Sequence, residues 1–233
     1  MSNLAMEVGG LGKKFRLHTQ GDVEIEVFRG LDFNVAFGEC VALHGPSGCG
    51  KSTLLRALYA NYTVGEGAIR VRHRDGWVDM ARAEPRAILA VRRHSMGYVS
   101  QFLRVIPRVP ALEIVAEPLR LHGIGADEAR RRAGDMLARL NVPERLWNLA
   151  PATFSGGEQQ RINIARGFIA ARPILLLDEP TAALDAANRA VVADLILERK
   201  AAGTAIVGIF HDAEIRHQVC DRVFEIEQFK AAA

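Results

Sequence analysis

The chain has 233 residues, 49% of them hydrophobic, which is enough for one α/β domain with a packed core and argues against disorder. A net charge of +3 is too small to indicate nucleic-acid binding without a basic stripe or a reading motif. Its three unpatterned cysteines, Cys40, Cys49 and Cys220, argue for a reducing compartment rather than a disulfide framework. Residues 1–14 lack a signal-peptide core, and no apolar run is long enough to cross a bilayer. We therefore expect a cytoplasmic protein that reaches a membrane only through a partner.

Apolar runs near the N-terminus predict the strands of a small sheet. Residues 4–8 and 23–28 are rich in Val, Ile, Leu and Phe, and residues 31–37 alternate apolar and polar side chains. The stretch from Gly9 to Gly12 is expected to break the first strand.

A phosphate-binding loop is the most informative stretch of the chain. The pattern G-x-x-x-x-G-K-[ST] is matched by Gly45, Pro46, Ser47, Gly48, Cys49, Gly50, Lys51, Ser52 and Thr53. An apolar strand pattern over 40–44 precedes the loop and a helical pattern over 54–59 follows it, which is the context that this motif needs. Backbone N–H groups of such a loop, together with the helix start, favour phosphate oxygens. Lys51 is expected to reach the β- and γ-phosphates, and Ser52 to ligate Mg²⁺.

Phe15 and Cys49 each leave two alternatives open. Phe15 is either an aromatic ring that stacks on adenine or a half-buried strand residue. Cys49 lies near Lys51 and a helix N-terminus, which would lower its thiol pKa and make it sensitive to oxidants. Alternatively, Cys49 is only a small residue that the loop tolerates.

Strand patterns end near Gln101 and give way to helical ones. Residues 68–80 predict a hairpin and residues 85–94 a helix, and residues 96–101 predict a strand that ends on Gln101. Residues 102–165 predict a helical insert. We therefore divide a single domain into a core of residues 1–101 and 166–233 and a helical lobe of residues 102–165.

One predicted helix of the lobe carries a run of arginines. Its apolar face consists of Ala129, Ala133, Leu137 and Leu140. The arginines at positions 130–132 lie mostly off that face and form either a solvated surface or a docking surface.

The sheet pattern resumes after the lobe. Strands are predicted over 174–178, 205–210 and 223–226, and helices over 182–200 and 213–220. Alternating strands and helices predict a mostly parallel sheet. Asp178, at the end of an apolar strand, is placed to help hold Mg²⁺, and Glu179 beside it to polarise an attacking water. The alternative role for this acidic pair is a turn or a helix cap.

A second anion-binding pattern precedes another predicted helix. It consists of Ser155, Gly156 and Gly157, followed by Glu158 and Gln159. A serine hydroxyl and backbone N–H groups at a helix start bind anions. Because the chain already has one phosphate loop, a second cradle makes sense if it serves the nucleotide of another subunit.

Taken together, these motifs resemble the ATP-binding cassette (ABC) family over nearly the whole chain. They occur in the family's order: Phe15, the phosphate loop, Gln101 of the Q-loop, the signature at 155–159, the Walker B strand ending at Asp178, Glu179, a D-loop with Asp185, and the switch residue His211. The resemblance implies a P-loop NTPase fold with an antiparallel β subdomain and a helical subdomain. It also implies two chains paired head to tail around two ATP molecules with Mg²⁺.

The same resemblance assigns roles to single residues. Gln101 would sense Mg²⁺ and the γ-phosphate, and His211 would contact the γ-phosphate and steady the water. The signature would complete the partner's ATP site. Two departures are small: Glu158 stands where many members have Gln, and Phe210 stands where Thr is common. Neither removes a required group, so we expect ATP hydrolysis.

Within the family, several stretches resemble the PhnL subfamily, the L subunits of the bacterial phosphonate carbon–phosphorus lyase system. They cover residues 54–62, 101–108, 140–147, 149–151 and 208–212. The resemblance implies soluble lyase core subunits and a sister ABC subunit as partners, which the ATP-driven dimer would remodel. That system assembles a ribose 1-methylphosphonate 5-triphosphate from ATP and methylphosphonate, and we assign the chain only ATP hydrolysis in it.

Two other functions remain as alternatives. Most free-standing cassettes are ATPase subunits of transporters, here of a lipoprotein-release or efflux type. A regulatory or repair ABC protein that binds nucleic acid is disfavoured, because the chain has one cassette and no reading motif.

Overall fold

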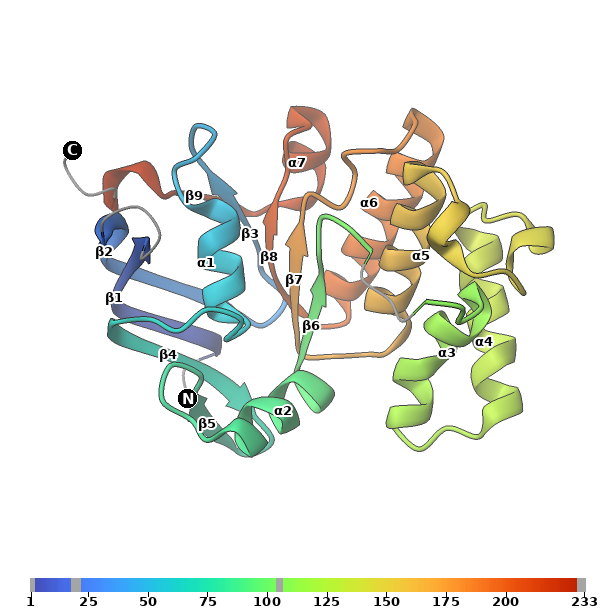
Figure 1. The fold of residues 1–233 in the computed structure, drawn as a ribbon, viewed down its shortest axis with the longest axis horizontal. Coiled ribbons are helices and arrows are strands. Elements are labelled where there is room, and N and C mark those ends of the chain that lie inside the picture. The colour runs from blue at the N-terminus through green and yellow to red at the C-terminus, as the bar shows by residue number, and fades with distance from the viewer. Residues whose placement is uncertain (1–2, 18–21, 104–106, 230–233) are drawn as a thin grey trace.

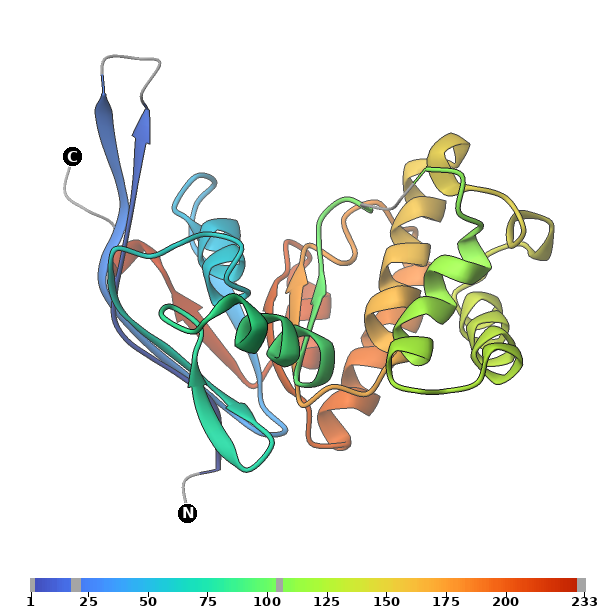
Figure 2. The same ribbon diagram turned by 60° about the horizontal axis from the view of Figure 1, so that its bottom comes forward.

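Two β-sheets and a set of helices build the fold in a computed structural model that describes residues 3–17, 22–103 and 107–229. Along the long axis of the molecule an antiparallel sheet comes first, a parallel sheet lies in the middle, and helices form the other end (Figure 1). Figure 2 shows the same arrangement from another side, with strands β1 (Leu4–Leu17) and β2 (Val23–Ala36) far from helices α3 (Ala111–Leu121) and α4 (Ala126–Arg139). The predicted fold class is confirmed by this architecture.

The antiparallel sheet has the strand order β2-β1-β4-β5. Its strands are β1 (Leu4–Leu17), β2 (Val23–Ala36), β4 (Glu66–His73) and β5 (Gly76–Asp79). The predicted break at residues 9–12 is wrong, and the two strands predicted over 23–37 are one. Shifts of register between β1 and β2, such as that between Val8 and Leu11, bend the pair where we expected it to end. A β-bulge accommodates an extra residue without ending the ladder.

The second sheet is parallel throughout and has the strand order β6-β7-β8-β3-β9. Its strands are β3 (Cys40–His44), β6 (Met96–Val99), β7 (Ile174–Asp178), β8 (Ala205–Ile209) and β9 (Arg222–Glu225). Every residue of β7 and β8 is buried, as expected for strands covered on both faces.

Strand β3 shows how the sheet divides the core. Its side chains alternate between two faces, as they must in a strand. Val41 and Leu43 pack with the antiparallel sheet and helix α1, whereas Cys40 and Ala42 pack on the side of the helices. The sheet therefore stands between two apolar layers and is held rigidly from both sides.

Helices cover the parallel sheet and form the lobe. They are α1 (Lys51–Leu58), α2 (Pro85–His94), α3 (Ala111–Leu121), α4 (Ala126–Arg139), α5 (Gly156–Ile169), α6 (Ala186–Ala201) and α7 (Ala213–Val219), with short 3₁₀ turns at Glu144–Leu146, Pro151–Thr153 and Glu227–Phe229. The helix predicted from residue 182 begins later, because the Asp185 side chain accepts a hydrogen bond from the Asn188 N–H and caps α6 there. Among the described residues, none of these helices combines the length and the apolar character needed to cross a bilayer.

The described part of residues 102–165 contains helices and turns and no strand. The predicted apolar face of α4 is buried. Its arginines lie in ion pairs, Arg131 with Glu128 and Asp135, and Arg130 with Glu113 of α3. These pairs favour a solvated surface for the arginine run. The division at residues 101 and 166 stays a prediction, and α5 runs across the second of these boundaries.

Where β4 pairs with β1, no room is left for a side chain at Gly67. Its φ is +85°, and a Cβ would lie 2.6 Å from the carbonyl oxygens of Gly9 and Gly10. Neither backbone oxygen can move away without breaking the ladder.

We predict that Gly67→Ala lowers the free energy of unfolding by about 1–3 kcal/mol, because the alanine is strained and meets backbone. Gly65→Ala is the matched control, since a Cβ there meets nothing within 4 Å. Denaturant unfolding followed by circular dichroism measures both, and equal losses would contradict the prediction.

Candidate functional site

The predicted phosphate loop connects β3 to α1 (Figure 1). Pro46, Ser47 and Gly48 are exposed, and the Lys51 ammonium donates to the carbonyl oxygens of Gly45 and Pro46 at 2.7 and 2.9 Å. Lys51 therefore already points across the loop.

Beneath the loop, Cys49 closes the space under Gly45. Its exposure is 1%, its Sγ lies 3.9 Å from the Lys51 Nζ, and a Cβ on Gly45 would lie 2.7 Å from that sulfur. This burial favours a packed small residue over an oxidant-sensitive thiol. The rest of the predicted loop residues lie at the loop and the start of α1: Gly50 is buried, and Ser52 and Thr53 are half-buried.

Ser52 meets the carboxylate of Asp178, which lies at the end of β7 and is fully buried. The Ser52 hydroxyl donates to Oδ1 at 3.0 Å, and the Tyr98 hydroxyl donates to Oδ2 at 2.9 Å. Burial raises the pKa of Asp178 above its ordinary value even though these two donors favour the ionised form. The Ser52 hydroxyl and the buried Asp178 carboxylate lie side by side and offer oxygen ligands of the kind that Mg²⁺ prefers, so these residues fit this ion.

Glu179 is held between two predicted site residues. Gln101 Nε2 donates to its Oε2 at 3.1 Å, and His211 Nε2 lies 2.8 Å from its Oε1. The backbone of Glu179 has a φ of +53°, a left-handed conformation that costs a non-glycine residue on the order of 1 kcal/mol. The structure therefore brings these three side chains together and fixes the direction of the Glu179 carboxylate.

The signature residues form the start of α5. The Ser155 hydroxyl accepts the N–H of Glu158, and the Glu158 carboxylate accepts the N–H and the hydroxyl of Ser155 at 2.9 and 2.8 Å. This reciprocal capping box explains why glutamate suits a position where glutamine is common. Hydrogen bonds from Ser155 lower the pKa of Glu158 below its usual range. Ser155 and Gly156 are exposed.

The signature contacts the D-loop of its own chain. Gly157 lies against the Ala183 carbonyl oxygen, and Gln160 donates to the Pro180 carbonyl oxygen at 3.1 Å. Asp185 is exposed at the cap of α6, and its hydrogen bonds from Asn188 lower its pKa. Contact of Asp185 or of the signature with nucleotide stays a prediction.

Phe15 is half-buried on β1 and packs against Tyr62, which follows α1. Its ring meets Tyr62 edge to face at 5.3 Å between centroids, and the Lys13 ammonium lies 4.4 Å from the Phe15 centroid. Stacking on adenine therefore remains open beside the structural role.

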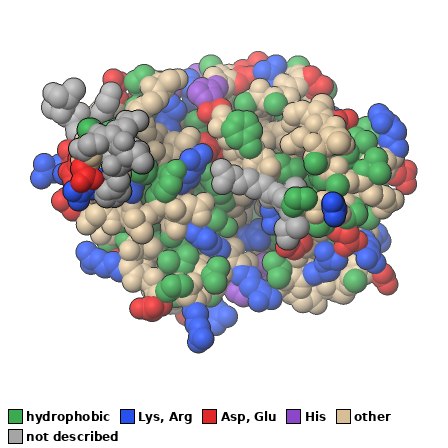
Figure 3. Space-filling view, in the orientation of Figure 1, with side chains coloured by type: hydrophobic (Ala, Val, Ile, Leu, Met, Phe, Trp, Pro, Cys, Tyr) green, Lys and Arg blue, Asp and Glu red, His purple; other side chains and the backbone are tan. Residues whose placement is uncertain are grey.

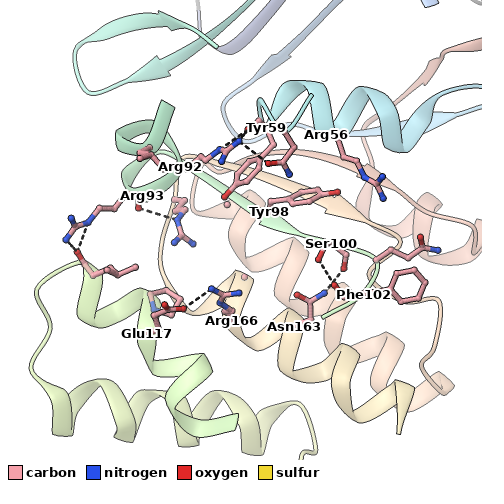
Figure 4. A pocket seen from close by; sticks show the side chains of 18 of the residues that line it. Arg56, Tyr59, Arg92, Arg93, Tyr98, Ser100, Phe102, Glu117, Asn163 and Arg166 are labelled. Atoms are coloured by element: carbon pink, nitrogen blue, oxygen red, sulfur yellow. Dashed lines mark hydrogen bonds and ion pairs between the residues drawn. The ribbon is translucent and has the colours of Figure 1, made fainter. Parts of the chain in front are cut away.

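A cleft of about 740 Å³ opens next to Gln101, between α1, α2, β6, α3 and α5 (Figure 4). Its lining is basic and aromatic: it includes Arg56, Arg92, Arg93, Arg166 and Arg172, together with Tyr59, Tyr98 and Phe102. Lys and Arg side chains lie among hydrophobic ones around the middle of this face of the molecule (Figure 3).

Sequence reasoning missed the cleft arginines and Tyr98. The arginines are scattered along the chain and carry no motif. The available signal for Tyr98 was its place three residues before Gln101, on a predicted strand.

Comparisons with known proteins give a matching family model and relatives that are named as ATP-binding proteins of release and export systems. A family model described as ABC transporter matches residues 28–182. The lipoprotein-releasing system ATP-binding protein LolD of Legionella pneumophila (strain Paris) is 36% identical over 217 residues, which cover 93% of this chain and 93% of LolD. The macrolide export ATP-binding/permease protein MacB 1 of Aeromonas hydrophila is 34% identical over 222 residues, and this chain spans only 33% of its length.

Solved structures of a cassette named MJ0796 share the fold. Its dimeric post-hydrolysis structure, bound to ADP and Pi, has a TM-score of 0.85 and 28% identity, covering 94% of this chain and 93% of that one. A second dimeric structure of MJ0796, described as a bacterial ABC transporter cassette, has a TM-score of 0.84.

Proposed function

Because the chain belongs to the ABC transporter family, we propose that it binds ATP with Mg²⁺ and hydrolyses it in a head-to-tail dimer. The observation that carries the proposal is the convergence at one edge of the parallel sheet. The phosphate loop, Asp178 with Ser52, and Glu179 with Gln101 and His211 all follow the carboxyl ends of neighbouring strands.

The chemistry of each group follows from its position. The loop N–H groups and Lys51 would bind the phosphates, and Ser52 and Asp178 would hold Mg²⁺. When bound, Mg²⁺ neutralises charge on the β- and γ-phosphate oxygens. Glu179, whose carboxylate is held by Gln101 and His211, would orient the attacking water and accept its proton.

We infer a second subunit because, among the described residues, no contact joins the signature to the phosphate loop of its own chain, whereas it contacts the D-loop. Ser155 and Gly156 are exposed at the N-terminus of α5, where N–H groups and the helix dipole favour an anion. We infer that they complete the partner's site, and that Asp185 and Phe15 contact nucleotide in the same assembly.

We predict that Glu179→Gln slows ATP hydrolysis by roughly 100-fold or more, because the water loses its base, and leaves an ATP-bound dimer. Phosphate release and size-exclusion chromatography with ATP and Mg²⁺ measure the two effects. Glu144→Gln, at an exposed turn of the lobe, is the control and should behave as wild type. A strictly monomeric Glu179→Gln protein would argue against the divided site.

Mixing two inactive variants tests the divided site directly. We predict that Lys51→Ala and Ser155→Arg are each inactive alone, since each damages both sites of a homodimer. Their heterodimer keeps one intact site, so an equimolar mixture should recover roughly a quarter of wild-type activity, as statistical pairing requires. No recovery, despite heterodimers seen by native mass spectrometry, would show that each site lies within one chain.

The named relatives favour a membrane permease as the partner, because LolD and MacB carry names of release and export systems. We therefore propose an ATPase subunit of a lipoprotein-release or efflux transporter, placed at the cytoplasmic side by its permease. The cleft beside Gln101 is where we propose that the partner docks.

A specific observation supports a second candidate, an ATPase subunit of the phosphonate carbon–phosphorus lyase system. Its support is the PhnL-like sequence of the stretches described above, three of which lie wholly or partly in the lobe; residues 104–106 of one stretch are outside the described residues. The partners would then be soluble lyase core subunits and a sister ABC subunit.

An affinity pull-down of the tagged protein from phosphate-starved cells, read by mass spectrometry, separates the two candidates. Recovery of an integral membrane permease supports the transporter. Recovery of carbon–phosphorus lyase subunits without a permease supports the phosphonate system. Neither result alters the roles proposed for the ATP site.

A further inference from the structure

Tyr98 belongs both to the cleft and to the neighbourhood of the predicted metal site. It lies on β6, the strand next to β7, which carries Asp178. Its ring lines the cleft and stacks on Tyr59 with 5.1 Å between centroids (Figure 4). Its hydroxyl leaves the cleft wall and donates to Asp178 Oδ2 at 2.9 Å. One side chain therefore spans the wall between the cleft and the carboxylate.

The Asp178 carboxylate depends on these donors for its orientation. It is fully buried, and its two oxygens each accept one of the side-chain hydrogen bonds, from Ser52 and from Tyr98. Ser52 is itself a proposed Mg²⁺ ligand, so its hydroxyl has two tasks. Tyr98 is the donor that only positions the carboxylate, in the way that outer groups orient metal ligands in other sites.

Neighbouring side chains hold the Tyr98 hydroxyl in the position from which it donates to Asp178. A tyrosine hydroxyl carries its proton at neutral pH, since the ordinary pKa of this group is about 10, so Tyr98 is the donor in its hydrogen bond to Asp178. Arg56 lines the cleft together with Tyr98, and it donates to the Tyr62 hydroxyl at 3.0 Å. Tyr59, on the other side, is covered by the Arg92 guanidinium 4.5 Å from its ring centroid. The ring therefore cannot turn away without disturbing three neighbours.

We propose that Tyr98 is a positioning residue that orients the Asp178 carboxylate for the metal ion bound with ATP. The proposal rests on the proposed function, in which Asp178 is a metal ligand. It goes beyond the motifs of the family resemblance, none of which includes Tyr98. Because the same ring forms part of the cleft wall, Tyr98 also connects the cleft to the metal-binding carboxylate in one step.

The test compares metal binding with nucleotide binding in Tyr98→Phe. This variant removes one oxygen and keeps the ring that packs on Tyr59. Mn²⁺ serves as the metal probe, and its affinity for the ATP-bound full chain is measured by electron paramagnetic resonance. ATP affinity in EDTA is measured by calorimetry. Tyr98→Phe should weaken Mn²⁺ binding by about tenfold and leave metal-free ATP affinity within about twofold, since only the carboxylate loses a donor.

Two further variants separate the possible outcomes. Tyr59→Phe is the matched control from the same ring stack and should keep both affinities. Asp178→Asn should abolish tight Mn²⁺ binding; if it does not, the proposed metal site fails, and the role of Tyr98 with it. If Asp178→Asn loses Mn²⁺ and Tyr98→Phe binds it as wild type does, only the Tyr98 proposal is overturned. Equal weakening of ATP with and without metal in Tyr98→Phe would show a merely structural role and would also overturn it.

Discussion

The direction of the strands in the parallel sheet is the constraint on which the rest of the structure depends. Because β6, β7, β8 and β3 run the same way and pair in that order, their carboxyl ends meet at one edge. Gln101, Asp178 with Glu179, His211 and the phosphate loop follow these four ends. The direction and the order of the strands are therefore enough to bring together residues that are up to 166 positions apart in the sequence. Burial of the strands on both faces makes that edge rigid.

The site keeps features that oppose folding and suit a charged ligand. Asp178 is fully buried, and its pKa is raised because the loss of hydration outweighs two hydrogen bonds. Glu179 is held at a positive φ. A cation beside Asp178 would offset the loss of hydration of this carboxylate, so its burial is consistent with a role in holding the metal ion that accompanies ATP.

The chain is an ABC ATPase, and its fold does not by itself identify what ATP hydrolysis drives. The proposed ATP site at the carboxyl edge of the parallel sheet would serve any partner equally well. The cleft and the lobe form the surface that would distinguish one partner from another. The cleft is basic, with five arginines in its lining against one glutamate, Glu117, which pairs with Arg166. Tyr98 lines that surface and donates a hydrogen bond to the Asp178 carboxylate.

Sequence patterns alone predicted the phosphate loop, the parallel sheet and the order of the site motifs. The loop is a motif of consecutive residues, and the other two follow from the order of short patterns along the chain. The predicted strand break was wrong because chain-distant pairing overrides the local signal: Gly9 to Gly12 continues a strand that pairs with β2 and β4. The predicted start of α6 was wrong for a local reason, because the Asp185 side chain caps the helix there rather than at residue 182. The fold alone showed that Gln101 and His211 hold Glu179 and that Tyr98 donates to Asp178. These contacts join side chains across neighbouring elements, and no local pattern of residues specifies such a distance.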